Sequence, residues 1–324
     1  SLIMIKVEKG SITRVLSILK NFKSSVSVSK TWQENKNDNF SINQLRDFYK
    51  NESGKGLIEK NIKIFPYKLN QNIHGSLKFT YSTRGILSFL YNTFKYCLNY
   101  IYFPLLVLLH FNKLPRQERQ IKGMYFYFFG KPFNGNIKKY IFQYKFLFPY
   151  LDKDMKNFLE VGGGYGGMCE LIFHNFDVEN YFIIDIPETL CVTSYYLSHV
   201  TDLNVLLIEN EGDIEEISNK KKNVILIPAN IYKNLDLENF KIDFFINSNS
   251  FAEIGEDFIK RYMEFFVKYS KKSSFFLSFN QTERSELHQN KQSIYSLDWA
   301  SAELNGQIFK RFKKDESEAG IIKF

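Results

Sequence analysis

Hydrophobic and polar positions are patterned differently in the two halves of the chain. From Lys156 onward, short continuous apolar runs alternate with segments whose apolar residues recur at helical spacing. Residues 1–150 have helix-like apolar spacing and polar loops, but no regular alternation of strand and helix. The pattern therefore predicts a mainly helical N-terminal region, residues 1–120, followed by an α/β domain, residues 121–324.

The apolar runs of the second half predict the strands of one sheet. They are NFLEV, NYFIIDI, NVLLIE, KNVILIP, KIDFFINSNS, SSFFLSFN, QIFKRF and GIIKF. The intervening segments GGMCELIFHNF, PETLCVTSYYLSHV and GEDFIKRYMEFFVKYS have the spacing of helices. Continuous apolar strands separated by helices indicate a buried, mostly parallel sheet with helices on both faces. Ligands of such sheets bind at the carboxyl ends of the strands, so the residues after each strand are candidate site residues.

A dense run of glycines, GGGYGG, follows the first of these strands. Gly162, Gly164 and Gly167 fit the GxGxxG pattern of dinucleotide sites. Gly162, Gly164 and Gly166 fit the GxGxG loop of class I methyltransferases equally well. Glycine has no Cβ, so in both cases the backbone can turn tightly and approach a ligand. The loop alone leaves both ligands open.

Acidic residues at the ends of the first two strands bear on that choice. Glu160 lies two residues ahead of the first glycine. A carboxylate there opposes an anionic pyrophosphate, but it suits the cationic sulfonium and ammonium groups of S-adenosylmethionine. Asp185, at the end of the next strand, suits a pair of ribose hydroxyls in either ligand. Glu160 therefore favours S-adenosylmethionine.

Composition and charge change this picture little. The formal net charge is +8, which is compatible with a polyanion partner, but the lysines are scattered in short runs, so no nucleic-acid partner is predicted. The three cysteines form no CxxC pair, which argues against a disulfide framework and suits a reducing cytoplasm. The five histidines lack metal-ligand spacing, so no metal is predicted.

One apolar segment, residues 85–111, resembles a membrane span in composition. Lys95 and Pro104 interrupt it, and its uninterrupted part is shorter than the ~20 residues that a spanning helix needs. We expect a helix pair broken at Pro104, buried in the core or at a homodimer interface. Peripheral membrane contact is the alternative. The predicted location is the cytoplasm, with the inner face of the membrane as the alternative.

The blocks around these motifs resemble, in order, those of the bacterial sugar O-methyltransferases, which are S-adenosylmethionine-dependent enzymes of the class I fold. They are FGKPFNG, FLEVGGGYGGM, IDIPETL with YYL, LIPANIYKNL, FINSNSFAEI with FIKRYMEFF, and SFNQ. The resemblance extends from about residue 120 to 285. It implies a Rossmann-like, mostly parallel sheet of seven strands. It also implies methyl transfer to a sugar hydroxyl of a nucleotide sugar or a surface-polysaccharide unit.

The resemblance further implies roles for individual residues. It assigns cofactor contacts to Glu160, Gly162, Gly164, Gly166, Asp185, Ile186, Pro187, Asn247, Ser248, Gln143 and Tyr140. Asp185 would hold the ribose, and Asn247 with Ser248 would lie near the reactive methyl group. Polar residues after the fifth strand are candidates for binding sugar hydroxyls. They are Asn280, Gln281 and Arg284.

A base must lie within hydrogen-bond reach of the sugar hydroxyl, because that hydroxyl is protonated at pH 7. Glu253, which follows the fourth strand, is the first candidate, although an acid before a helix also suits the helix dipole. His288, past the fifth strand, is the second. Three alternatives remain open: a methyltransferase with another small or lipid-linked acceptor, a non-catalytic cofactor-binding scaffold, and a nicotinamide dehydrogenase.

Overall fold

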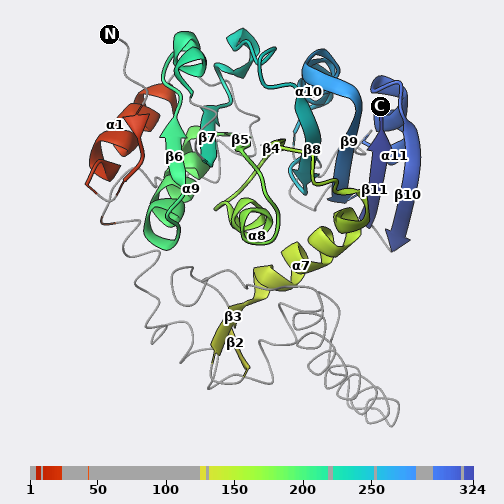
Figure 1. Cartoon of the computed structure of the whole chain (residues 1–324), viewed down its shortest axis with the longest axis horizontal. Helices are drawn as coiled ribbons and strands as arrows, with labels where there is room; N and C mark the ends of the chain where they lie inside the picture. The colour runs from red at the N-terminus through yellow and green to blue at the C-terminus, as the bar shows by residue number, and fades with distance from the viewer. Residues whose placement is uncertain are drawn as a thin grey trace. The chain divides into compact units, whose positions relative to one another are not determined.

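The computed structural model describes residues 5–8, 10–23, 43, 125–128, 131–217, 222–251, 254–281, 295–314 and 317–324 (Figure 1). The chain divides into two compact units, residues 1–45 with 142–324, and residues 46–141. The predicted boundary near residue 120 and the apolar segment 85–111 lie outside the described residues. Within the described ranges, no helix is long and apolar enough to cross a membrane.

A nine-stranded sheet forms the centre of the first unit, counted over the described residues. Six neighbouring strands run parallel to one another, from β6 to β9, while β1 and β11 run antiparallel to the strands beside them. Figure 1 shows the sheet from β6 at the left to β10 at the right. In spatial order the strands are β1 (Ile5–Lys6), β6 (Asn204–Leu207), β7 (Asn223–Pro228), β5 (Asn180–Asp185), β4 (Asn157–Val161), β8 (Ile242–Ser248), β9 (Ser270–Gln281), β11 (Ser317–Lys323) and β10 (Gln307–Lys314).

The expected α/β architecture is confirmed, but the expected count of seven strands is wrong. Two strands, β6 and β1, extend the sheet beyond β7. The run NVLLIE indicated the first of them. The second is only two residues long and pairs antiparallel with β6, Ile5 opposite Leu207. A two-residue strand has no periodicity of its own, so the sequence pattern cannot reveal it.

The helices of the first unit follow the sequence pattern closely. Pro187 occupies the first turn of its helix, α9, where a proline costs no hydrogen bond. The amphipathic helix α10 buries Tyr262, Phe265 and Tyr269 of its aromatic stripe, whereas Phe258, in its first turn, is exposed. Helix α1 lies against α9. The bounds are α1 (Ile12–Lys23), α8 (Gly167–Asn175), α9 (Pro187–Val200), α10 (Glu256–Tyr269) and α11 (Leu297–Glu303).

Helix α7 (Gly135–Leu147) contains the division between the two units, which falls between residues 141 and 142. Before it, β2 (Tyr125–Phe128) and β3 (Lys131–Asn134) form an antiparallel hairpin. The sequence pattern did not predict this hairpin, because its aromatic run YFYF lacks the polar alternation of an exposed strand. Short 3-10 helices complete the list: η2 (Phe148–Tyr150), η3 (Glu211–Glu216) and η4 (Tyr232–Asn234).

Both faces of the central strands are buried. On one face Leu159, Phe182 and Phe245 belong to a core shared with α10 and α11. On the other face a row of aromatic rings crosses four strands in register: Tyr181, Phe158, Phe244 and Phe275 stack side by side. Burial on both faces explains the continuous apolar runs.

The strand order places a ligand crevice. If β4, β5, β7, β8 and β9 are numbered 1 to 5 in chain order, their spatial order is 3-2-1-4-5. This is the order of doubly wound sheets, which reverses direction between strands 1 and 4. Here the reversal lies between β4 and β8. The carboxyl ends of these two strands are therefore the place to examine.

Candidate functional site

The loop between β4 and α8 holds three glycines in left-handed conformation. The φ angles of Gly162, Gly164 and Gly166 are 77°, 57° and 91°. A Cβ added at Gly162 would lie 2.4 Å from the side chain of Ser250, whereas one added at Gly164 would meet no atom within 4 Å. Gly162 is thus required by packing against the end of β8. Gly164 faces open space, where a ligand can approach the backbone.

Side chains from two other elements fix Gly164. Its N–H donates to Asp185 Oδ2 at 3.1 Å, and its carbonyl accepts from the hydroxyl of the buried Thr193 on α9. The other carboxylate oxygen of Asp185 accepts from the N–H of Ile186 at 2.8 Å. Asp185 is half-buried at the end of β5. The predicted ribose-binding acid therefore also orders the glycine loop.

Glu160 lies directly beneath the loop. It is buried, its Oε2 accepts from the hydroxyl of Tyr181 at 2.9 Å, and a Cβ added at Gly163 would lie 3.4 Å from that same oxygen. The pKa of Cys169, in the first turn of α8, reflects the charges around it. Burial raises its pKa well above the usual value, and the carboxyl groups of Glu160 and Glu170 raise it further. The region under this helix N-terminus is therefore electronegative.

Asn247, at the end of β8, joins the two strands that flank the crevice. Its amide nitrogen donates to the carbonyl of Val161 at 2.9 Å and to the hydroxyl of Ser250. Its amide oxygen accepts from the N–H of Phe251 at 3.3 Å. Asn247 thus lies at the carboxyl end of β8, and its amide forms hydrogen bonds with protein groups on β4 and in the segment after β8; its predicted contact with the cofactor stays a prediction.

Gln143 on α7 brings an unsatisfied acceptor to the end of β8. The side chain is fully buried, and its amide nitrogen donates to the hydroxyl of Ser248 at 2.6 Å. Its amide oxygen is buried and has no hydrogen-bond partner among the residues that the structure describes. Such an atom is costly unless a ligand or a water satisfies it. Tyr140 lies on the same helix, one turn before Gln143.

The remaining predicted residues fall into three groups. Ile186 and Pro187 follow Asp185 and begin α9, beside the loop. Asn280 is buried at the end of β9, where its nitrogen donates to Ser278 Oγ at 3.1 Å and its oxygen has no hydrogen-bond partner within the described ranges; Gln281 is the last residue of that strand. Outside the described residues lie Glu253, Arg284 and His288, whose roles remain predictions.

Three residues contribute to the site without having been predicted from the sequence. The hydroxyl of Thr193 donates to a carbonyl of the glycine loop, and the hydroxyl of Ser250 donates to the carbonyl at the end of β4. The hydroxyl of Tyr181 donates to Glu160. A buried polar residue on an otherwise apolar helix face was the available signal for Thr193. Tyr165 packs edge-on against Tyr196, with ring centroids 5.0 Å apart, and covers Gly167.

Comparisons with known proteins add context. No protein-family model matches the chain, and no curated protein matches it. Similar solved structures include the pyocyanin biosynthetic protein PhzM (13% identity, TM-score 0.40) and the mitomycin 7-O-methyltransferase MmcR (10%, 0.38). The alignments cover 58% and 53% of this chain, but only 56% and 50% of those two proteins.

A third similar structure is the N-methyltransferase NodS from Bradyrhizobium japonicum in complex with S-adenosyl-L-homocysteine. Its identity is 10% and its TM-score 0.38, over 58% of this chain and 86% of that one. Identities and TM-scores this low carry no argument about what this chain binds or does. The strand order and the geometry at the ends of β4, β5 and β8 are the observations that bear on function.

Proposed function

We propose that this protein is an S-adenosylmethionine-dependent methyltransferase that transfers the methyl group to a sugar hydroxyl. The observation that carries the proposal is the buried Glu160 carboxyl group directly beneath the glycine loop. A carboxyl group there favours a ligand with cationic sulfonium and ammonium groups. The acceptor class rests on the sequence blocks that resemble sugar O-methyltransferases, above all FINSNSFAEI.

The residues at the crevice fit this cofactor. Gly164 leaves its Cα side open, Asp185 presents a carboxylate suited to a ribose diol, and the amide oxygen of Gln143 is an acceptor for an ammonium group. When bound, the cofactor supplies an electrophilic methyl group on sulfur. Glu160, Asp185 and Gln143 would hold it from three elements, namely β4, β5 and α7.

A dinucleotide fits the same crevice less well. A pyrophosphate binds at the exposed N-terminus of a helix. The first turn of α8, Gly167 to Cys169, is buried, and a Cβ added at Gly167 would lie 2.6 Å from the ring of Tyr165. The two carboxyl groups that raise the pKa of Cys169 also oppose an anion there. Sterics and charge both favour the methyl donor.

The protein's part in the reaction is alignment and proton removal. Methyl transfer is an in-line displacement, so the acceptor oxygen must face the methyl carbon opposite the sulfur. Asn247 and Ser248 end the strand beside the glycine loop, where they would define that line. The buried Asn280 oxygen would accept a hydrogen bond from an acceptor hydroxyl. Glu253 and His288 remain the proposed bases.

Isothermal titration with S-adenosylhomocysteine and with NAD tests this proposal. We expect micromolar binding of the homocysteine compound, no binding of NAD, and a loss of at least about tenfold in affinity for Asp185→Ala. Asp177→Ala is the matched control, because it removes an exposed carboxylate that precedes the same strand. Binding of NAD, or equal losses in both variants, would overturn the proposal.

A further inference from the structure

One end of the sheet carries an exposed aromatic surface. Three phenylalanines have large exposed fractions, Phe142 on α7 (44%) and Phe309 (48%) and Phe312 (39%) on β10, and they lie beside the partly buried Phe279 on β9. A group of exposed aromatic side chains of this size often marks an interaction surface. We call this the β10 face, defined by Phe142, Phe275, Phe279, Phe309, Phe312, Lys310 and Lys323.

Strand register places these residues on one face. Phe275 and Phe279 on β9 lie opposite Lys323 and Ala319 on β11, and Ala319 lies opposite Phe312 on β10. Lys310 lies opposite Ile321 on the same face, and the register shift between Ile308 and Lys310 marks a bulge at Phe309. Figure 1 shows β9, β11 and β10 side by side at one end of the sheet.

The rings pack by their edges, Lys323 lies over the faces of two of them, and Lys310 lies over the neighbouring ring of Phe146. Phe142 meets Phe312 and Phe279 at interplanar angles of 63° and 81°, and Phe309 meets Phe275 at 82°. The ammonium of Lys323 lies 5.7 Å from the ring centroids of both Phe275 and Phe309. The surface therefore offers apolar ring edges bordered by fixed positive charges.

We propose that the β10 face docks onto an anionic lipid membrane. Interfacial binding requires apolar side chains that enter the headgroup region, and basic side chains that reach anionic lipids. Phe309 and Phe312 supply the first, and Lys310 and Lys323 the second. In the described parts of β9, β11 and β10, no residue known to share this face is acidic. The net charge of +8 acts in the same direction.

A second copy of the chain is a poorer occupant. The strand β10 is the edge of the sheet, and edge strands can pair with a copy of themselves. A symmetric pairing of two β10 strands would place Lys310, Arg311 and Lys313 against the same residues of the copy. Like charges opposite one another destabilise strand pairs. An anionic surface meets the same residues with favourable charge.

A single-stranded nucleic acid is also a poorer occupant. Its bases stack on the open faces of aromatic rings. On the β10 face the rings meet edge-to-face, and the face of Phe309 lies under the ammonium of Lys323. The geometry therefore offers lysine-bordered ring edges in place of stacking platforms.

Cosedimentation of the full chain with vesicles tests this proposal. We expect binding to vesicles of phosphatidylcholine mixed with phosphatidylglycerol, little binding to phosphatidylcholine alone, and weaker binding at high salt. The double variant Phe309→Ser with Phe312→Ser, and the double variant Lys310→Gln with Lys323→Gln, should each lose roughly tenfold in apparent affinity. The control is Phe258→Ser, which changes an equally exposed phenylalanine on α10.

Other outcomes would overturn the docking surface. Wild-type binding by both double variants, with circular dichroism showing that they are folded, would exclude the β10 face. Equal binding to both kinds of vesicle would exclude charge recognition. Binding of an oligouridine probe without vesicle binding, or a wild-type dimer that the phenylalanine variant converts to a monomer without vesicle binding, would assign the face to another occupant.

Discussion

At the scale of single residues, two glycines of the loop after β4 have the same backbone conformation for different reasons. Gly162 packs against Ser250, whereas Gly164 faces open space, and both have positive φ. An alanine in left-handed conformation costs about 1–2 kcal/mol from backbone strain alone. At Gly162 the clash with Ser250 adds to that strain. Sequence spacing identifies both glycines but cannot distinguish them. The neighbour of Gly162 is Ser250, which follows β8 and lies far from the loop in the sequence.

This difference predicts that alanine at Gly162 mainly lowers stability and that alanine at Gly164 mainly lowers ligand affinity. Gly162→Ala should lower the free energy of unfolding by about 3 kcal/mol or more, and Gly164→Ala by about 1–2 kcal/mol. Gly164→Ala should nevertheless lose most of its affinity for S-adenosylhomocysteine, because the new methyl group occupies the open side of the loop. Urea unfolding and calorimetric titration of both variants check this. Equal destabilisation would contradict the packing assignment.

The exposed carboxylate of Asp177 pairs with two lysines, which perturb its pKa. Hydrogen bonds from Lys156 and Lys222, both at 2.8 Å, lower its pKa to about 2. A lowered folded-state pKa stabilises the protein above the usual value of 3.8, and this contribution is lost as the pH falls toward 2. Asp177 is exposed, so we expect only a small effect on stability.

Lys222→Met should raise the pKa of Asp177 toward its usual value, since one of the two cations is removed. Carboxyl carbon chemical shifts measured against pH by NMR follow this directly. Lys241→Met, whose amine pairs with Glu238 instead, is the control and should leave the Asp177 midpoint unchanged. A midpoint near 3.8 in the wild type would contradict the ion-pair geometry.

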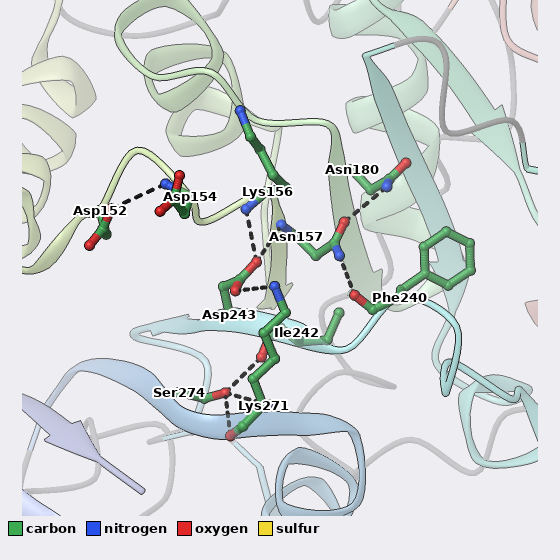
Figure 2. Close-up of polar contacts among 10 residues, drawn as sticks. All are labelled: Asp152, Asp154, Lys156, Asn157, Asn180, Phe240, Ile242, Asp243, Lys271 and Ser274. Carbon is green, nitrogen blue, oxygen red and sulfur yellow. Dashed lines mark hydrogen bonds and ion pairs between the residues drawn. The ribbon is translucent and has the colours of Figure 1, made fainter.

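At the scale of elements, the amino ends of the parallel strands are joined by side-chain amides. Asn157, Asn180, Asn223 and Asn204 occupy one register row across β4, β5, β7 and β6, and the amides of the last three each donate to the asparagine before them at 2.7–2.9 Å. Figure 2 shows the start of this row at Asn157, which also donates to the carbonyl of Phe240. The row lies at the amino ends of the strands, opposite the candidate site, and its hydrogen bonds hold these ends in register.

A substitution in the middle of the asparagine row should lower the free energy of unfolding more than a substitution at its end. Asn180→Ala removes one donor and one acceptor at a buried position and should lower the free energy of unfolding by about 2–3 kcal/mol. Asn204→Ala removes only the terminal donor at a half-buried position and should cost about 1 kcal/mol. Chemical unfolding of both variants checks this order, which a reversal would disprove.

Asp243 on β8 stabilises the same edge of the sheet, where the parallel strands begin. Its carboxylate accepts from the backbone N–H groups of Lys156 and Asn157 at 2.8 and 2.9 Å, and it pairs with Lys271 (Figure 2). The sequence placed Asp243 in an apolar strand without indicating this role. Helix and strand types followed from apolar periodicity, whereas side-chain bonds between distant strands depend on register, which no local pattern contains.

At the scale of the whole molecule, the sheet order was only partly predictable. Continuous apolar strands indicated a buried parallel sheet, and GGGYGG with Asp185 indicated the ends of its first two strands. The pairing of Ile5 with Leu207 joins residues about 200 positions apart and leaves no local trace. Likewise the buried Glu160 was predictable in type and position, but its bond to Tyr181 and its place beneath Gly163 were not.

Helix α7 carries Gln143 of the candidate site. The boundary between the two compact units also falls within this helix, immediately before Phe142. If the oxygen of Gln143 gains a partner from the ligand, the helix should open less often. We expect S-adenosylhomocysteine to slow hydrogen exchange at residues 142–147 and to raise the melting temperature with increasing concentration. Gln143→Met should keep most of the stability, since it removes the unsatisfied oxygen, but lose the protection. Unchanged exchange on ligand binding would refute this coupling.

The central claim is that a buried carboxyl group under the glycine loop selects a cationic methyl donor. The most direct measurement is calorimetric titration of S-adenosylhomocysteine into the wild type and into Glu160→Gln. Glutamine keeps an oxygen for the hydroxyl of Tyr181 and removes the acidic group. We predict micromolar binding to the wild type and at least about tenfold weaker binding to the variant. Equal affinities, or binding of NAD by the wild type in its place, would contradict the account.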